Sequence, residues 1–274
     1  MWGTVGLFVQ NLSDFGLKPV DMAAMRLCIA GLALAAWLQI RSPGVLRLHS
    51  RKDLLLFVGT GSVSIALFNL FYFSSIGEIG MSLAVVLIYT GPGFVLILGR
   101  IWFGEPITPV KVASLLLMFI GVAFVSNIRL TGLADVSILG SLLGIAAAAS
   151  FALYNLIGKY ALSRYPSETV VVYTFLFSGF TLLPFSGLHH HASTLLQAEP
   201  FIWAAGLTIF PTLLAYLLYT NGLNRMEAGR ASITGVSEIL MAIILGILIF
   251  GESLSLYQSF GIIMVIGAMF LIRR

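Results

Sequence analysis

The chain has 274 residues, of which 59% are hydrophobic and only 9% are charged, and its mean hydropathy is +1.01. Soluble domains carry about 25% charged residues, so this composition excludes a soluble globular protein. It predicts a polytopic membrane protein, in which each helix needs roughly 20 apolar residues to cross the bilayer. We attribute the net charge of +4 to membrane topology and expect no nucleic-acid partner.

Charges and helix-breaking residues divide the chain into apolar segments joined by short links. In chain order the predicted spans are 1–17, 20–40, 54–74, 80–102, 109–127, 137–159, 168–187, 201–222, 230–250 and 255–272. Closed barrels are excluded, because the apolar runs are long and do not alternate with a period of two. The predicted fold is an all-α polytopic membrane protein with ten transmembrane helices.

Lys and Arg are distributed unevenly between the two sides of this arrangement. One side collects Arg41, Arg47, Arg51, Lys52, Arg100, Lys111, Lys159, Arg164, Arg225, Arg230, Arg273 and Arg274. The other side holds only Lys18, Arg26 and Arg129. The positive-inside rule then predicts that both termini are cytoplasmic. We expect a multi-pass protein of the plasma membrane, which is the inner membrane in bacteria.

The sequence offers little for a metal or another cofactor, and we expect none. Cys28 is the only cysteine, so a disulfide framework and a thiolate metal site within one chain are excluded. His189, His190 and His191 are adjacent, and adjacent residues cannot all face one metal on a regular element. We therefore expect adventitious metal affinity at most in this loop.

The chain repeats itself at an interval of 147 residues. IWFGEPITPVKVASLLLMFIGVAF (101–124) matches LIFGESLSLYQSFGIIMVIGAMF (248–270), and Glu105 precedes Glu252 by this interval, as Pro19 precedes Pro166. The sequence predicts two five-helix repeats, 1–130 and 131–274. Five is odd, so the second repeat must be inverted in the membrane. Inverted repeats are typical of secondary transporters, whose substrate sites lie near the midplane.

Four pieces of sequence, in order, also point to a known family. They are MWGTVGLFVQ (1–10), MRLCIAGLAL (25–34), YTGPGFVLILGRIWFGEPIT (89–108) and SEILMAIILGILIFGESLS (237–255). On these residues the chain resembles the EamA-type members of the drug/metabolite transporter superfamily over essentially its whole length. The resemblance implies an exporter or exchanger of small metabolites, commonly amino acids, with a central cavity between the repeats.

The chain departs from the family pattern at two places. The family's ninth helix usually reads Glu-Pro where this chain has Glu238-Ile239, which predicts that the second repeat lacks its helix break. The first helix starts almost at its Trp-Gly, whereas the matching sixth helix has about a dozen residues before Phe151. We expect about ten further residues ahead of the first helix.

Glu238 is the leading candidate for function. It stands before eleven uncharged residues and lies roughly 12 Å into a core about 30 Å thick. A carboxylate at this depth costs about 2.5–3.5 kcal/mol on insertion scales. We expect an acid that is neutral at rest and can exchange a proton, the candidate coupling ion, or meet a cationic group. The alternative is a protonated Glu that hydrogen-bonds across helices as packing glue.

The equivalent stretch of the first repeat is YTGPGF, Tyr89–Phe94. Gly91, Pro92 and Gly93 are expected to interrupt the fourth helix and to free carbonyls that could face a cavity, a plain Pro kink being the alternative. Arg26 is expected to pair with Glu78 or a lipid headgroup, or to receive a substrate carboxylate. Polar residues inside apolar helices complete the candidates: Asn69, Tyr72, Tyr154, Asn155, Tyr216 and Tyr219. They could line a pocket for a zwitterion, or the tyrosines could anchor the interface.

Glu105 and Glu252 are interpreted as architectural, because each sits in a Gly-led turn with Thr108-Pro109 or Ser253 as a cap of the following helix. GSLLG (Gly140–Gly144) is interpreted as a helix-packing face. No phosphate loop, catalytic triad or carboxylate pair is present, so we expect no enzyme. The predicted function is a secondary transporter working by alternating access on a small metabolite, an amino acid or similar amphipathic compound. The alternatives are a membrane-embedded enzyme and a transport-inactive sensor or accessory protein.

Overall fold

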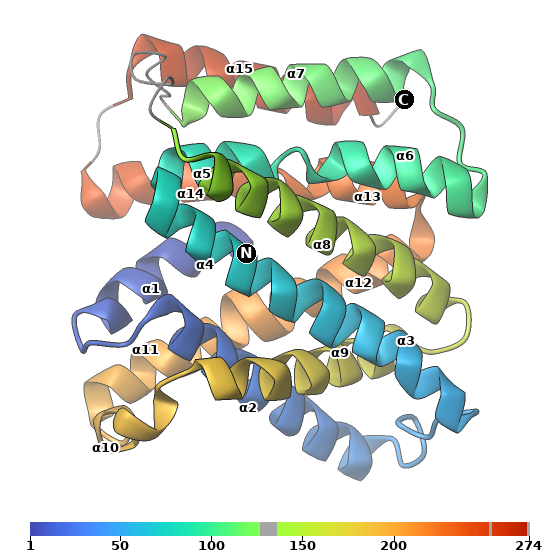
Figure 1. The fold of residues 1–274 in the computed structure, drawn as a ribbon, viewed down its shortest axis with the longest axis vertical. Helices are drawn as coiled ribbons and strands as arrows, with labels where there is room; N and C mark the ends of the chain where they lie inside the picture. The colour runs from blue at the N-terminus through green and yellow to red at the C-terminus, as the bar shows by residue number, and fades with distance from the viewer. Residues whose placement is uncertain (127–135, 252–253, 273–274) are drawn as a thin grey trace. The chain divides into compact units, whose positions relative to one another are not determined.

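The computed structural model describes residues 1–126, 136–251 and 254–272 (Figure 1). These residues are helical or in connecting turns, and no strand occurs among them. The longer helices are α1 (Val5–Ser13), α2 (Pro19–Arg41), α4 (Leu67–Ile79), α6 (Gly91–Phe103), α7 (Pro109–Val125), α8 (Ile138–Leu162), α9 (Ser167–Leu182), α11 (Ala198–Thr208), α12 (Ala215–Arg225), α14 (Glu238–Phe250) and α15 (Leu256–Ile272). The shorter helices are α3 (Leu54–Val58), α5 (Met81–Ile88), α10 (Ala192–Leu195) and α13 (Ala228–Gly235).

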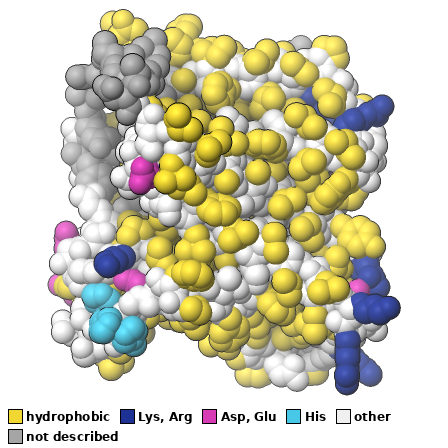
Figure 2. Space-filling model, in the orientation of Figure 1, with side chains coloured by type: hydrophobic (Ala, Val, Ile, Leu, Met, Phe, Trp, Pro, Cys, Tyr) yellow, Lys and Arg dark blue, Asp and Glu magenta, His cyan; other side chains and the backbone are white. Residues whose placement is uncertain are grey.

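In the described residues, seven helical stretches are long and apolar enough to cross a membrane. They are Pro19–Arg41, Arg51–Ile79, Met81–Phe103, Ile138–Leu162, Ser167–Phe185, Ala198–Arg225 and Ala228–Ile249. α7 and α15 are apolar but shorter, and the predicted span 1–17 contains a 3-10 turn, Trp2–Thr4, followed by the nine-residue helix α1. A polytopic membrane protein is thus supported, whereas the predicted count of ten spans is not confirmed. Hydrophobic side chains are spread over the face drawn in Figure 2, and the charged side chains on it lie mainly near its left and right edges.

The chain forms two compact units, each assembled from two separate stretches. The first unit comprises Met1–Asn69 and Ile157–Asn224, and the second comprises Leu70–Leu156 and Arg225–Arg274. The first unit thus combines a stretch from the first half of the chain with one from the second half, whereas Leu70–Leu156 of the second unit runs across the middle of the chain.

In the first unit α9 packs against α2 and against the helical segment η3 (Gly59–Ala66), and small residues lie at both contacts. A Cβ added to Gly179 would lie 2.6 Å from Cys28 Sγ, and one added to Gly61 would lie 2.7 Å from the Thr174 carbonyl. Distances below 3.0 Å are closer than real Cβ contacts, so glycine is required where these backbones approach. α1 packs against α11 through a buried apolar cluster that includes Leu12 and Leu207.

In the second unit α7 and α15 lie side by side (Figure 1). They cross at Gly121 and Gly261, where a Cβ on Gly121 would lie 2.9 Å from the Gly261 carbonyl. The predicted packing face on α8 is confirmed at both glycines. A Cβ on Gly140 would lie 2.5 Å from Glu78 Cβ, and one on Gly144 would lie 2.8 Å from Leu87 Cδ1.

The helix limits in the second unit recur at the 147-residue interval. α5, α6 and α7 span 81–88, 91–103 and 109–125, and α13, α14 and α15 span 228–235, 238–250 and 256–272. Gly104 and Gly251, which follow α6 and α14, both adopt the left-handed conformation, with φ of 69° and 65°. Glycine tolerates this conformation best, which explains why both helices end there.

Two π-helical segments interrupt the α-helical hydrogen bonding in the first unit. They are η3 (Gly59–Ala66) and η7 (Ile209–Leu214). Pro211, which has no N–H, lies in the second segment. In each segment a hydroxyl donates to the carbonyl five residues earlier: Ser64 to Gly59 at 2.7 Å, and Thr212 to Leu207 at 2.8 Å. Such local widening of a helix is frequent at functional sites.

Candidate functional site

The site in the second unit is built around a hydrogen bond between Tyr89 and Glu238. The Tyr89 hydroxyl donates to Glu238 Oε1 at 2.8 Å. Tyr89 directly follows α5, and Glu238 is the first residue of α14. The bond therefore joins the break between α5 and α6 to the break between α13 and α14.

The first break follows from the local sequence. Pro92 lies in the first turn of α6, where its missing N–H is tolerated. The backbone N–H of Thr90 bonds to the Leu87 carbonyl, a spacing of three residues in place of four. The predicted interruption of this helix is confirmed, and it lies at Tyr89 and Thr90, just before Gly91.

The second break occurs without a proline, so the prediction that this repeat lacks a break is wrong. Ser237 N–H bonds to the Thr234 carbonyl at 3.1 Å, and Ile239 N–H bonds to the Val236 carbonyl at 3.0 Å, again with a spacing of three. Gly235, a poor helix former, ends α13. Val236 and Ser237 separate the two helices at the positions that correspond to Tyr89 and Thr90.

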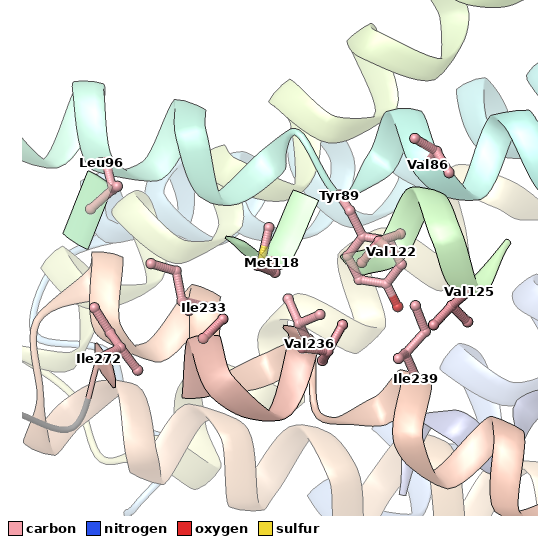
Figure 3. Close-up of a cluster of buried hydrophobic side chains, with 12 residues drawn as sticks. Val86, Tyr89, Leu96, Met118, Val122, Val125, Ile233, Val236, Ile239 and Ile272 are labelled. Carbon is pink, nitrogen blue, oxygen red and sulfur yellow. The ribbon is translucent and has the colours of Figure 1, made fainter. Parts of the chain in front are cut away.

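The environment of the pair is apolar on one side and polar on the other. Figure 3 shows the Tyr89 ring among Val122 and Val125 of α7, with its hydroxyl pointing towards Val236 and Ile239. Glu238 is partly buried and lies at the N-terminus of α14, where the helix dipole favours negative charge. Two features thus offset the cost of burying the Glu238 carboxylate: the hydrogen bond from the Tyr89 hydroxyl and the positive end of the dipole of α14. Tyr72 of α4 lies in the same unit, with its ring 5.8 Å from that of Phe73.

A second polar cluster fixes the other end of α13. Glu105 is buried, and its carboxylate accepts from Ala228 N at 2.8 Å and from Gly229 N at 3.3 Å. It therefore caps the first turn of α13. The architectural interpretation of Glu105 is supported, although the helix that it caps is α13. Thr108 caps α7 as expected, by accepting from Lys111 N at 3.3 Å.

Lys111 completes this cluster. The sequence analysis counted it only among the positive charges of one membrane side and predicted no buried partner for it. Its side chain is 2% exposed, and Nζ lies 2.7 Å from Glu227 Oε2 and 2.7 Å from the Pro106 carbonyl. Glu227 also pairs with Arg230 at 3.4 Å. Because a buried ammonium requires a partner, the Lys111–Glu227 pair holds the start of α7 next to the start of α13.

Arg26 belongs to a polar group in the first unit. Its Nη1 donates to Thr212 Oγ1 at 3.3 Å, and its Nη2 donates to Asn69 Oδ1 at 3.5 Å. Glu78, proposed from the sequence as a partner, lies in the second unit and accepts from Ser137 Oγ at 2.9 Å. Thr212 was missed by the sequence analysis, and the only signal for it was the neighbouring Pro211.

The remaining predicted tyrosines and asparagine lie in different surroundings. Tyr216 is buried, with its ring 5.1 Å from Trp2 and 5.1 Å from Phe175, and Tyr219 is 4.8 Å from Trp2. Tyr154 and Asn155 of α8 are fully buried, and the Asn155 amide donates to the Phe151 carbonyl at 3.0 Å. Burial argues against the interface-anchor alternative for Tyr154 and Tyr216.

The histidine run contributes to a loop contact. His191 Nε2 lies 4.0 Å from Asp21 Oδ2, and Asp21 also accepts from Lys18 N and Gly187 N. Across the described residues, no group of three His, Cys, Asp or Glu side chains could hold a metal ion. Glu252, Ser253, Arg129, Arg273 and Arg274, used in the sequence analysis, lie outside the described residues, as does the predicted boundary at 130.

Comparisons with known proteins agree on one family. The model of the EamA-like transporter family matches residues 1–127 and 138–274. The uncharacterized transporter YxxF of Bacillus subtilis (strain 168) is 28% identical over 284 residues, which covers 100% of this chain and 87% of that protein. The uncharacterized inner membrane transporter YicL of Salmonella typhimurium is 26% identical over 285 residues, 99% of this chain and 91% of that protein.

A solved crystal structure has the same fold. It aligns with a TM-score of 0.81 at 18% identity and covers 98% of this chain and 91% of that chain. At this identity the likeness concerns the fold alone. The names of the relatives indicate transport across a membrane, and they name no substrate.

Proposed function

The chain belongs to the EamA-like transporter family, and from this premise we propose that it moves a small metabolite across the plasma membrane as a secondary transporter. The proposed substrate is an amino acid or a similar amphipathic compound, exported or exchanged by alternating access. The observation that carries this proposal is the Tyr89–Glu238 hydrogen bond, which places an ionisable group where two broken helices meet. Ionisable residues within membrane helices, and helices broken at depth, both mark transport pathways.

The chemistry of the pair suits a group that gains and loses a proton. A phenol O–H can donate either to a carboxylate oxygen or to the carbonyl oxygen of a protonated acid. Tyr89 can therefore keep its hydrogen bond in both states of Glu238. We propose that Glu238 exchanges a proton, or meets a cationic group of the substrate, during the transport cycle.

The duplication of the chain supports alternating access. The helix limits recur at 147 residues, and the family model matches the two halves separately. We propose that the halves, 1–130 and 131–274, are inverted five-helix repeats. Repeats of this kind allow the same movement to open a site first to one side and then to the other.

The proposed orientation has both termini in the cytoplasm, and cysteine labelling tests it. In a Cys28→Ser background, His189→Cys should react with an impermeant maleimide from outside, and Arg164→Cys should react only after the membrane is permeabilised. Both positions are at least partly exposed. Labelling of both from one side would contradict this orientation and the inversion of the repeats.

Flux separates transport from the alternatives. A strain that overproduces the protein is screened for resistance to toxic amino acids and their analogues, and the hits are tested in proteoliposomes as labelled substrates. We expect protein-dependent, saturable counterflow of at least one compound. Chemical conversion of the compound without counterflow would favour a membrane-embedded enzyme, and binding without either would favour a sensor or accessory protein.

A further inference from the structure

We propose that Arg26 is an anion-binding residue of the first unit, and that it receives the carboxylate of an organic acid or amino acid. The inference rests on the proposed transport function, since it names the substrate group that one side chain recognises. Three features of the described residues carry it: the chemistry of the partners of Arg26, the way these partners are oriented, and the buried aromatic rings nearby.

The first feature is that Arg26 has only neutral hydrogen-bond partners within the described part of its unit. Thr212 and Asn69 accept at 3.3 Å and 3.5 Å, which are long distances for a guanidinium. The two buried acids of this unit have other partners: Asp53 binds Arg164 and Tyr165, and Asp21 binds two backbone amides. The charge of Arg26 therefore lacks a matching carboxylate in this unit.

The depth of Arg26 makes such a charge expensive. It lies seven residues after Pro19 in the membrane-spanning helix α2, or about 10 Å along its axis. An arginine at membrane depth is disfavoured by about 2.5–3.5 kcal/mol on insertion scales unless it finds a partner. A guanidinium has five N–H donors, and the two hydrogen bonds above occupy only two of them. The others can bind one carboxylate in a bidentate manner.

The second feature is that both acceptors are held in place by their own donors. Asn69 Nδ2 donates to the Ile65 carbonyl at 2.7 Å, so Oδ1 is the atom turned to Arg26. Thr212 Oγ1 donates to the Leu207 carbonyl at 2.8 Å, so its lone pairs face Arg26. Thr212 lies inside the π-helical segment η7, and Asn69 follows the π-helical segment η3 by three residues. The two π-helical segments thus position the acceptors that orient the guanidinium group of Arg26.

The third feature is an apolar wall near the guanidinium. Tyr216, one turn after Thr212, packs its buried ring against Trp2 and Phe175. A cation next to aromatic rings suits a ligand with an anionic head and an apolar body. The same unit shows no such arrangement for a cationic ligand, because its two buried carboxylates are taken up as described above.

Matched ligand pairs test the proposal on the full chain in detergent micelles. The probes are hexanoate against hexanamide and phenylalanine against phenylalaninamide, with inorganic phosphate as a third anion, and the readout is the shift in thermal unfolding midpoint as a function of concentration. We expect the wild type to be stabilised by at least one carboxylate and not by the amide of the same shape. Arg26→Gln should weaken this binding by about tenfold or more. Arg26→Lys keeps the positive charge but not the bidentate guanidinium, so it should weaken carboxylate binding less than Arg26→Gln does.

Arg41→Gln is the control, because Arg41 is an exposed arginine at the other end of the same helix. It should bind the carboxylates as the wild type does. Equal responses to acid and amide, no response to any acid, or an unchanged acid preference in a folded Arg26→Gln variant would overturn the proposal. Stabilisation by phosphate alone would also overturn it, and would assign Arg26 to lipid headgroups. Since binding is read in micelles, a protein that binds carboxylates without counterflow would refute only the transport function.

Discussion

The phenol of Tyr89 donates a 2.8 Å hydrogen bond to Glu238, and this bond connects two helix breaks that occupy equivalent positions in the two halves of the chain. Val236 and Ser237, in the second break, follow Tyr89 and Thr90 of the first by 147 residues. A tyrosine of one half thus stabilises the acid of the other half.

Removing the phenol hydroxyl should destabilise the second unit. Tyr89→Phe keeps the ring in its apolar cluster but leaves the Glu238 carboxyl without this donor, a loss of about 1–2 kcal/mol. Thermal unfolding in detergent micelles measures it. Tyr257→Phe, at an exposed tyrosine of α15, is the control and should stay within about 0.5 kcal/mol of the wild type. Equal stability of both variants would show that the bond contributes nothing.

Much of the second unit could be predicted from the sequence, because its helix limits are set by local chemistry. Glycines that follow helices, Pro92 in a first turn and long apolar runs predict the bounds of α6 and α7 closely. The helix break before Glu238 could not be predicted, because the sequence has no proline there. It depends on i−3 hydrogen bonds near Gly235, which several sequences could form.

The contacts of the candidate residues were harder to predict than their depth. Placing Glu238 and Arg26 inside apolar segments required only charge and spacing. Their partners depend on tertiary packing: Tyr89 reaches Glu238 from a distant segment, and Thr212 reaches Arg26 from a π-helical segment. The buried Lys111–Glu227 pair was missed for a related reason, since a lysine at the start of a helix is normally solvated.

The capping of α13 by Glu105 should be measurable. Glu105→Ala removes both acceptors of the Ala228 and Gly229 amides and should lower stability by about 1–2 kcal/mol, whereas Glu105→Gln retains one acceptor and should lose less. Glu199→Ala, at an exposed glutamate in the first turn of α11, provides the comparison in thermal unfolding. If Glu105→Ala is as stable as Glu199→Ala, the carboxylate does not cap α13.

The crossing of α7 and α15 requires glycine at position 121. Gly121→Ala places a Cβ 2.9 Å from the Gly261 carbonyl, so the helices must separate, and we expect a loss of about 1–3 kcal/mol. Gly77→Ala serves as the control, because Gly77 also lies in a helix but has no atom within 4 Å of an added Cβ. That variant should be neutral or more stable, owing to the higher helix propensity of alanine. Unfolding midpoints in the opposite order would contradict the close crossing.

Tyr165 should make stability depend on alkaline pH. Burial, together with its 2.6 Å hydrogen bond to Asp53, raises the pKa of Tyr165. A raised pKa in the folded state means that this contribution is complete below the unfolded pKa of about 10 and is lost as the pH rises through the folded value. The stability difference between the wild type and Tyr165→Phe should therefore be greatest near neutral pH and shrink above about pH 10.

Tyr160→Phe controls for this effect, because Tyr160 is an exposed tyrosine of α8. Its difference from the wild type should not change over the same pH range. A Tyr165→Phe penalty that stays constant as the pH rises would show that the hydroxyl of Tyr165 does not titrate with unfolding.

The most direct measurement of the central claim is the pH dependence of counterflow by Glu238→Gln in proteoliposomes. The amide preserves shape and can still accept from Tyr89, so we expect the variant to unfold at a midpoint near that of the wild type. Flux should fall about tenfold or more, which corresponds to roughly 1.4 kcal/mol or more, and its pH dependence should flatten. A stable Glu238→Gln variant with wild-type flux and an unchanged pH profile would contradict the account and would make Glu238 a packing residue.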